Sequence, residues 1–164
     1  MQKRTILFLL ILISITFGCT RDDICSEATQ TTPLLIITFK DISNPVQAKS
    51  VSNLTISTTD DPAMEIMTSV TTDSIAIPLK NNINTTRFLF IEGDIEESEG
   101  NTDTITFNYL RENIYVNRAC AFKTIYKEIN MAVDPENNTN WIQNTEILLT
   151  NVENENQAHI TIFH

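Results

Sequence analysis

The cysteines are the residues of this sequence whose positions indicate covalent chemistry, and the first of the three, Cys19, follows an apolar stretch. Lys3 and Arg4 precede the apolar residues 6–17, and Gly18 supplies the small residue that export signals place before their cleavage point. A membrane-spanning helix needs about 20 apolar residues, so we expect this shorter run to be cleaved. Cleavage before Cys19 would free its thiol and its amine for acylation.

The residues around the expected cleavage point resemble a bacterial lipobox, although Leu is commonest at its first position: Thr16-Phe17-Gly18-Cys19. We therefore predict a lipoprotein signal peptide at 1–18, a lipidated N-terminus and tether at 19–32, and one domain at 33–164. Acyl chains such as palmitate contribute roughly 0.8 kcal/mol per buried methylene, so two or three chains on Cys19 would anchor the protein to a membrane. The alternatives are an ordinary signal peptide cut near Gly18 and an uncleaved signal anchor.

The residues that follow Cys19 bear on location. An Asp directly after the lipidated Cys would resemble an inner-membrane retention signal, but this sequence has Thr20 at that position. The acidic pair Asp22-Asp23 resembles the surface-export tag of lipoproteins from Bacteroidetes-type bacteria. We therefore predict a cell-envelope protein that is lipid-anchored in the outer membrane, with the periplasmic and the surface-exposed face both open.

With Cys19 acylated, Cys25 and Cys120 remain as an even pair in an oxidising compartment. A disulfide between them would join the tether end of the domain to a core strand. In the chain-entropy model a loop of this length contributes about 4–5 kcal/mol to stability. The competing interpretation is a metal or redox pair, but the sequence has no Cys-x-x-Cys spacing and no histidine nearby.

Histidines are too few and too late in the chain to suggest a hydrolase. His159 and His164 are the only two, and no Gly-x-Ser-x-Gly motif accompanies them. They are five residues apart, so on a strand they would face opposite sides, and we expect surface or strand-end positions for both. A glycosidase carboxylate pair cannot be selected from sequence. We therefore predict no enzyme, and neither a cofactor nor a metal.

Two groups of residues are candidate ligand contacts. The densest acidic cluster could supply calcium ligands, but its spacing does not match an EF-hand loop, and a solvated hairpin loop is the simpler interpretation: Asp94, Glu96, Glu97, Glu99 and Asp103. Trp141 could form part of an aromatic platform for glycan, whereas a lone Trp beside Ile142 is more often a core or edge plug. The candidate contacts are thus Trp141, Asp94 and Glu96.

Charge excludes one class of partner. The whole chain has a net charge of -10, and removal of Lys3 and Arg4 with the signal peptide leaves 9 basic against 21 acidic side chains. Nucleic-acid backbones are bound by clustered Lys and Arg, so we predict no nucleic-acid partner. The same balance argues against electrostatic adhesion to anionic lipid.

Strand signals recur at short intervals after the signal, and no convincing helical period accompanies them. Alternation places Phe88 and Phe90 on one face of a strand, and it aligns Val116, Cys120 and Phe122 in a long strand or a bent pair. We predict an all-β fold: a single antiparallel β-sandwich, loosely immunoglobulin-like with Greek-key connections, after a cleaved signal peptide. The expected strands are 34–40, 51–58, 64–70, 74–79, 86–92, 104–111, 113–126, 146–151 and 159–163.

Several segments together resemble a family of small, uncharacterised Bacteroidetes-type lipoproteins known only as a domain of unknown function. The resemblance implies a lipoprotein and a paired role for the two later cysteines, and it implies no activity. The segments that carry it are Asp22-Asp23-Ile24-Cys25, Thr32-Pro33-Leu34-Leu35-Ile36-Ile37, Val51-Ser52-Asn53-Leu54, Thr106-Phe107-Asn108-Tyr109 and Arg118-Ala119-Cys120-Ala121-Phe122-Lys123.

The function predicted from these observations is a membrane-anchored envelope lipoprotein that acts as a non-catalytic binding or accessory module of an outer-membrane complex. Its partners would be the membrane, through Cys19, and another envelope protein. The alternative is a lipoprotein that captures glycan or a divalent cation. A protein partner predicts an exposed apolar patch or open strand edge. Glycan predicts an exposed Trp141, and a cation predicts carboxylates converging around Asp94.

Overall fold

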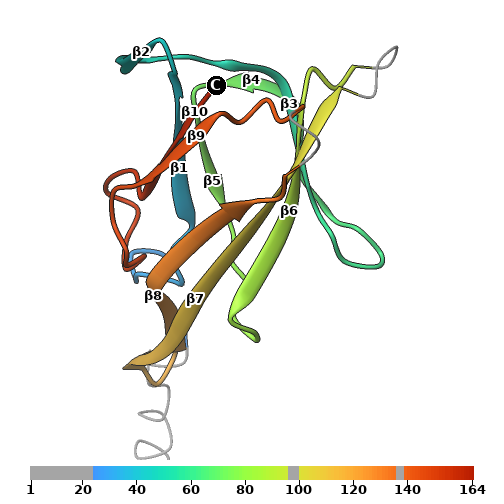
Figure 1. Ribbon diagram of the computed structural model, residues 1–164. Helices are drawn as coiled ribbons and strands as arrows, with labels where there is room; N and C mark the ends of the chain where they lie inside the picture. Colours follow the sequence, from blue (N-terminus) through green and yellow to red (C-terminus); the bar gives the residue numbers. More distant parts are fainter. Residues whose placement is uncertain (1–23, 96–99, 136–138) are drawn as a thin grey trace, which may run out of the picture.

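Alternating apolar residues build two β-sheets that pack face to face around one core (Figure 1). The computed structural model describes residues 24–95, 100–135 and 139–164, and over these ranges its regular elements are strands. Within the same ranges, no helix has the length and apolar character needed to cross a membrane. The predicted β-sandwich is confirmed.

The first sheet joins the two ends of the described chain. Its central strand β1 (Leu35–Asp41) pairs in parallel with β10 (Ile160–Phe163), and β10 pairs with the edge strand β9 (Asn144–Ile147). The opposite edge of β1 is shared by β2 (Asn44–Ala48) and β5 (Ser74–Ile77), both antiparallel to it. The parallel β1–β10 pair departs from the wholly antiparallel sandwich that we predicted, because strands far apart in the chain need no hairpin turn.

The second sheet is antiparallel throughout, in the order β4-β3-β6-β7-β8. Its strands are β3 (Val51–Thr58), β4 (Glu65–Thr72), β6 (Thr85–Glu92), β7 (Asn101–Asn117) and β8 (Ala121–Val133). The chain leaves this sheet after β4, adds β5 to the first sheet, and returns as β6 beside β3. Crossings of this kind between the sheets are expected for Greek-key connections.

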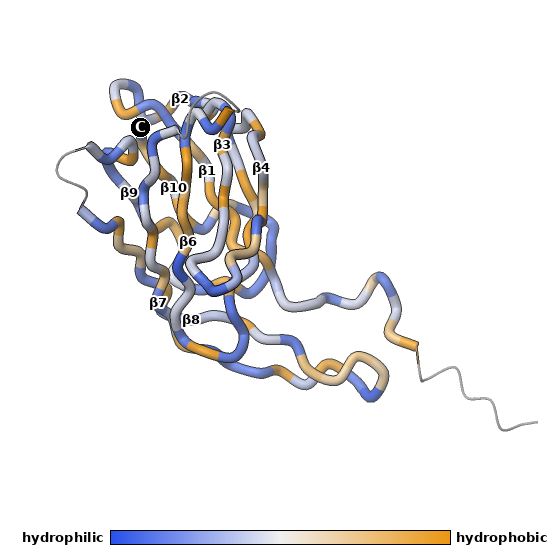
Figure 2. The backbone as a smooth tube through the Cα atoms, turned by 90° about the vertical axis from the view of Figure 1, so that its right-hand side faces the viewer, coloured by the Kyte–Doolittle hydropathy of each residue, from blue (hydrophilic) through white to orange (hydrophobic). Residues whose placement is uncertain are grey.

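The core forms from the inward-facing residues of both sheets, and apolar and polar stretches accordingly alternate along the strands in Figure 2. Phe88 and Phe90 are both buried on β6, as predicted, with ring centroids 6.4 Å apart. The ring of Phe107 on β7 packs against Phe88, with 6.2 Å between the ring centroids. Removing one of these rings would cost about 3–5 kcal/mol, because lost transfer energy and a cavity add.

The β7–β8 hairpin extends beyond the sandwich, at the lower end of Figure 1. Strand β6 pairs with β7 only as far as Asn108, so from Leu110 to Asn117 the only neighbour of β7 within the sheet is β8. The register shifts between Asn108 and Leu110, and such a bulge bends a strand pair. Of the two alternatives predicted for 113–126, a long strand or a bent pair, the structure has the bent pair, with its turn at 118–120, and Phe122 lies exposed.

Candidate functional site

Trp141 does not present the exposed ring that glycan binding requires. Its side chain is 6% exposed, and its Nε1 donates a hydrogen bond to the Phe90 carbonyl oxygen at 3.1 Å. The indole packs 6.3 Å from Phe39 and 5.7 Å from His164, measured between ring centroids. The exposed Trp141 that glycan binding would need is not present, and the residue is the core plug that was its alternative.

The acidic cluster is divided between different environments. Asp94 is partly exposed and Asp103 is fully buried, whereas Glu96 lies outside the described residues. The carboxylate of Asp103 accepts hydrogen bonds from the Ile142 backbone N–H at 2.8 Å and from Asn140 Nδ2 at 3.0 Å. Among the described residues, no group of three His, Cys, Asp or Glu side chains is placed to hold a metal ion.

Both histidines are buried, which corrects the expectation of surface positions, although they do flank strand β10. His159 is 1% exposed, and its Nδ1 accepts a hydrogen bond from the Ile36 N–H at 3.0 Å. Burial is the main reason why the pKa of His159 is lowered, and hydrogen bonding to the Asn154 backbone opposes it. His164 is 5% exposed and its Nε2 lies 3.2 Å from the Lys49 carbonyl oxygen. The His159 side chain thus links the start of β10 to β1, and the His164 side chain contacts the backbone just after β2.

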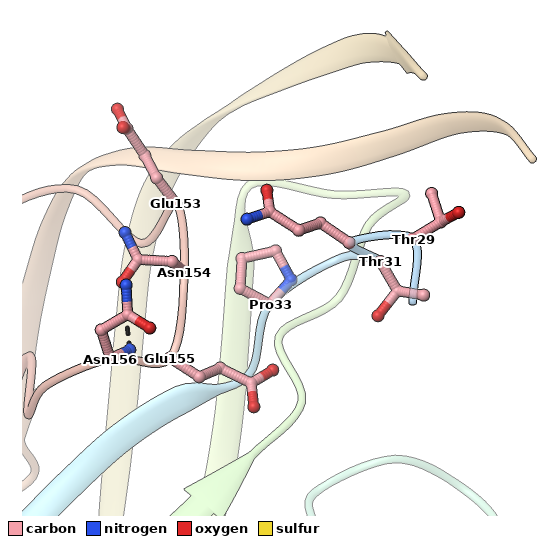
Figure 3. Close-up of a pocket in the computed structure, with 8 residues that line it drawn as sticks. Thr29, Thr31, Pro33, Glu153, Asn154, Glu155 and Asn156 are labelled. Atoms are coloured by element: carbon pink, nitrogen blue, oxygen red, sulfur yellow. Dashed lines mark hydrogen bonds between the residues drawn. The ribbon is translucent and has the colours of Figure 1, made fainter. Parts of the chain in front are cut away.

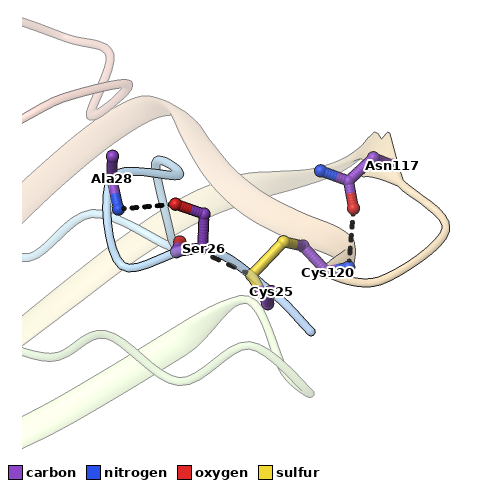
Figure 4. The surroundings of a disulfide bond; sticks show 5 residues. All are labelled: Cys25, Ser26, Ala28, Asn117 and Cys120. Carbon is purple, nitrogen blue, oxygen red and sulfur yellow. Dashed lines mark hydrogen bonds between the residues drawn. A yellow bond between two sulfur atoms is a disulfide. The ribbon is translucent and has the colours of Figure 1, made fainter. Parts of the chain in front are cut away.

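The predicted disulfide between Cys25 and Cys120 is present, with an S–S distance of 2.01 Å and 4.8 Å between the Cα atoms (Figure 4). Cys120 lies in the turn of the β7–β8 hairpin, where its N–H donates to Asn117 Oδ1 at 2.8 Å. Cys25 begins a segment that runs back along the hairpin, and Ser26 Oγ accepts from the Ala28 N–H. The bond fastens this N-terminal segment to the tip of the hairpin.

The N-terminal segment 25–34 is anchored at further points, so the described part of the tether predicted at 19–32 lies against the domain. Lys123 Nζ donates to Gln30 Oε1 at 2.9 Å, and the Thr124 N–H donates to Thr32 Oγ1 at 3.0 Å. On its other side, the Leu34 N–H donates to Glu155 Oε1 at 2.9 Å. An edge strand has unpaired backbone groups, and here the segment satisfies one of those of β8.

A polar groove lies where this segment, the hairpin and the loop 153–156 meet (Figure 3). Its first part has a volume of about 240 Å³, and its lining residues are Thr29, Gln30, Thr31, Pro33, Glu153, Asn154, Glu155 and Asn156. Its second part, of about 420 Å³, shares four of these residues and adds one face of the hairpin: Glu112, Ile114, Lys123, Ile125 and Lys127. We call the two parts together the hairpin groove.

The lining of the hairpin groove offers both charges and neutral amides. Lys127 forms an ion pair with Glu112, and the hydrogen bond and the charge of that carboxylate raise the pKa of Lys127. Asn154 Oδ1 accepts from the Asn156 N–H at 3.0 Å, which orders the loop. The carboxylates, ammonium groups and amides of the lining can form hydrogen bonds and ion pairs with a ligand.

Sequence reasoning did not identify this groove. Its walls are supplied by residues more than 100 positions apart, as the 121-residue separation of Leu34 and Glu155 illustrates. Each wall alone is an ordinary polar segment of the kind found in loops. The only usable signal was the Cys25–Cys120 pairing, which brings the N-terminal segment to the hairpin.

Comparison with known proteins identifies a family for this chain but no individual curated protein or solved structure that resembles it. A family model described as a family of unknown function, DUF6452, matches residues 53–164. No curated protein and no solved structure shows a significant match. The matched region begins within β3 and includes the hairpin, Cys120 and the loop 153–156, while the N-terminal wall of the groove precedes it.

Proposed function

We propose a function for a chain that belongs to the DUF6452 family of unknown function: a lipid-anchored envelope module that binds a protein partner and catalyses no reaction. The observation that carries the proposal is the Cys25–Cys120 disulfide. It fixes the segment that follows Cys19 against the hairpin, and this segment forms one wall of the hairpin groove. The proposed anchor at Cys19 is thereby only six residues away from a segment that is fixed beside the groove.

Export and acylation are supported by independent features. Disulfides persist in oxidising compartments, so the Cys25–Cys120 bond fits a protein that crosses the inner membrane. Residues 1–18 supply an export signal, and Cys19 stands where diacylation, with palmitate among the chains, would occur. We propose the outer membrane of a Bacteroidetes-type cell as the location, on either its periplasmic or its outer face.

A protein is the partner class that the groove favours. A net charge of -10 opposes nucleic acid, and the burial of Trp141 removes the tryptophan platform that a glycan would need. The groove instead combines carboxylates, a lysine–glutamate pair and three side-chain amides. Polar groups of both signs can match the backbone and charged side chains of an extended polypeptide, as at the polar rim of protein interfaces.

Site-specific crosslinking tests this proposal. A photoreactive residue is placed at exposed Asn156 in the groove, and a matched variant carries it at Val46, which is 88% exposed on β2. After irradiation of cells, the lipoprotein is isolated from gently solubilised membranes and analysed by quantitative mass spectrometry. We expect one envelope protein at near equal stoichiometry, crosslinked from position 156 and not from 46. Recovery of the chain alone, or equal crosslinking from both positions, would contradict the proposal.

A further inference from the structure

The tip of the β7–β8 hairpin carries two exposed aromatic side chains. Tyr115 is 58% exposed and Phe122 is 64% exposed, although they are paired across the hairpin with ring centroids 5.4 Å apart. No part of the second sheet other than β8 pairs with this end of β7, so the sandwich does not cover them. Tyr, with an apolar body and a polar end, is favoured at membrane–water interfaces, and the Phe122 ring adds exposed apolar area.

A covalent connection brings this tip close to the proposed lipid anchor. The hairpin turn contains Cys120, which is bonded to Cys25, and Cys25 is six residues after Cys19. Six residues span at most about 20 Å when fully extended. An acylated Cys19 would therefore keep the hairpin tip within about that distance of the membrane surface. Ile24, beside the disulfide, adds an apolar side chain that is 81% exposed.

The local charge at the tip differs in sign from that of the chain. Residues 113–126 contain Arg118 and Lys123 and no acidic residue, whereas the chain as a whole has a net charge of -10. The connector adds Arg21 against Asp22 and Asp23. Anionic headgroups attract basic side chains near the surface and repel acidic ones, so the charge of the hairpin tip is compatible with a position at a membrane.

From these three observations we infer that the tip of the β7–β8 hairpin inserts Tyr115 and Phe122 into the headgroup region of the membrane that holds the acylated Cys19. The inference rests on the acylation in the proposed function and adds a second contact to it. Two points of attachment, the acyl chains and the hairpin tip, orient the domain with the hairpin toward the lipid. The hairpin groove, which includes Lys123 near the tip, then opens close to the membrane surface.

Fluorescence quenching in vesicles tests the inference with the full lipidated protein. Trp141 is the only native tryptophan and is buried next to Phe90, whose partner in β7 is Asp103. Tyr115 is twelve residues farther along β7, a distance on the order of 40 Å. A Tyr115→Trp variant therefore reports on the tip, and a Val46→Trp variant reports on an exposed position in β2.

The variants are reconstituted into vesicles of phosphatidylethanolamine and phosphatidylglycerol with brominated acyl chains. We expect Tyr115→Trp to lose most of its added emission, and Val46→Trp and the wild type to lose almost none. Phe122→Trp serves as a second reporter on the opposite strand. If the two tip variants emit as strongly in brominated lipid as in ordinary lipid, as the β2 variant is expected to do, the inference is overturned.

The mass of the purified protein separates this inference from the proposed function. If Cys19 carries acyl chains and neither tip reporter is quenched, the hairpin contact is wrong while the anchor stands. If the mass shows an unmodified Cys19, the anchor and the contact that rests on it are both wrong. Quenching of both tip reporters in acylated protein supports the anchor and the hairpin contact together.

Discussion

At the scale of single residues, His159 links the last strand to the first. Its Nδ1 accepts the Ile36 N–H, and burial lowers its pKa below the usual value of about 6.5. Between the lowered pKa and 6.5, the unfolded chain therefore binds more protons at this site than the folded protein does. The stability that His159 contributes is complete above about pH 6.5 and is lost as the pH falls below it.

This titration predicts a pH dependence that can be assigned to one residue. We expect the free energy of unfolding of the wild type to fall more steeply than that of His159→Gln as the pH is lowered from about 7.5 to 5. Urea denaturation of both proteins at several pH values measures the difference, since the carboxylates contribute equally to each. Parallel curves for the two proteins would show that His159 does not titrate in this way.

Tyr126 is a second buried polar residue with a structural role. Its hydroxyl donates to the Leu79 carbonyl oxygen at 2.9 Å, and burial raises its pKa to about 12, so it stays protonated at neutral pH. Tyr126→Phe leaves that carbonyl unsatisfied, and we expect a loss of about 1–3 kcal/mol in the free energy of unfolding. Tyr115→Phe, at an exposed site, should change stability by less than about 0.5 kcal/mol in the same denaturation experiment. Equal effects of the two substitutions would refute this role.

At the scale of elements, two glycines border the connection between β6 and β7. Gly93 and Gly100 both have positive φ, at 73° and 67°. A Cβ at Gly100 would lie 2.5 Å from the Glu92 carbonyl oxygen, whereas one at Gly93 would meet nothing within 4 Å. The two positions share the backbone conformation and differ in space.

Alanine substitution separates conformational strain from steric overlap at this connection. We expect Gly93→Ala to cost about 1–2 kcal/mol, the price of a left-handed conformation for a residue with a Cβ. Gly100→Ala should cost more than Gly93→Ala, because backbone must also move to relieve the overlap. Thermal or urea unfolding measures both. A smaller loss for Gly100→Ala than for Gly93→Ala would mean that the backbone around Gly100 is easily displaced.

The disulfide holds the whole N-terminal segment in place. Cys25 and Cys120 are 95 positions apart, and in the chain-entropy model a loop of that length corresponds to about 4–5 kcal/mol. We expect the double variant Cys25→Ser/Cys120→Ser to lose up to that amount in unfolding free energy. In hydrogen exchange the Thr124 amide, bonded to Thr32 Oγ1, should lose protection, while the Val152 amide, bonded to the Tyr126 carbonyl oxygen, should keep it. Unchanged exchange at Thr124 would show that the segment stays bound without the disulfide.

At the scale of the whole molecule, the sandwich has two structurally different ends. One end holds the buried Trp141, Phe39 and His164 rings, which close the core. The other end carries the projecting hairpin, the disulfide and the hairpin groove. Because the chain enters the domain at the hairpin end, an anchor upstream of Cys25 would attach the domain to the membrane through that end. The proposed membrane contact and the proposed partner site are consequences of this single arrangement.

The sequence by itself determined the local elements. The period of two along a strand predicted the shared face of Phe88 and Phe90, because alternation follows directly from strand geometry, and a weaker alternation predicted β3 as Val51–Thr58. The Cys25–Cys120 bond followed from an even number of remaining thiols. The five-residue β2 was missed, since all its residues are exposed and no alternation marks it.

Only the tertiary structure decided which of these elements meet and which side chains are covered. Tyr115 and Phe122 are as apolar as core residues, yet they are exposed because β6 pairs with β7 only as far as Asn108. His159 reads as a surface residue, yet it is buried because β10 pairs with β1 from the far end of the chain. Alternation records the local twofold repeat of a strand, whereas burial depends on long-range pairing that no local pattern specifies.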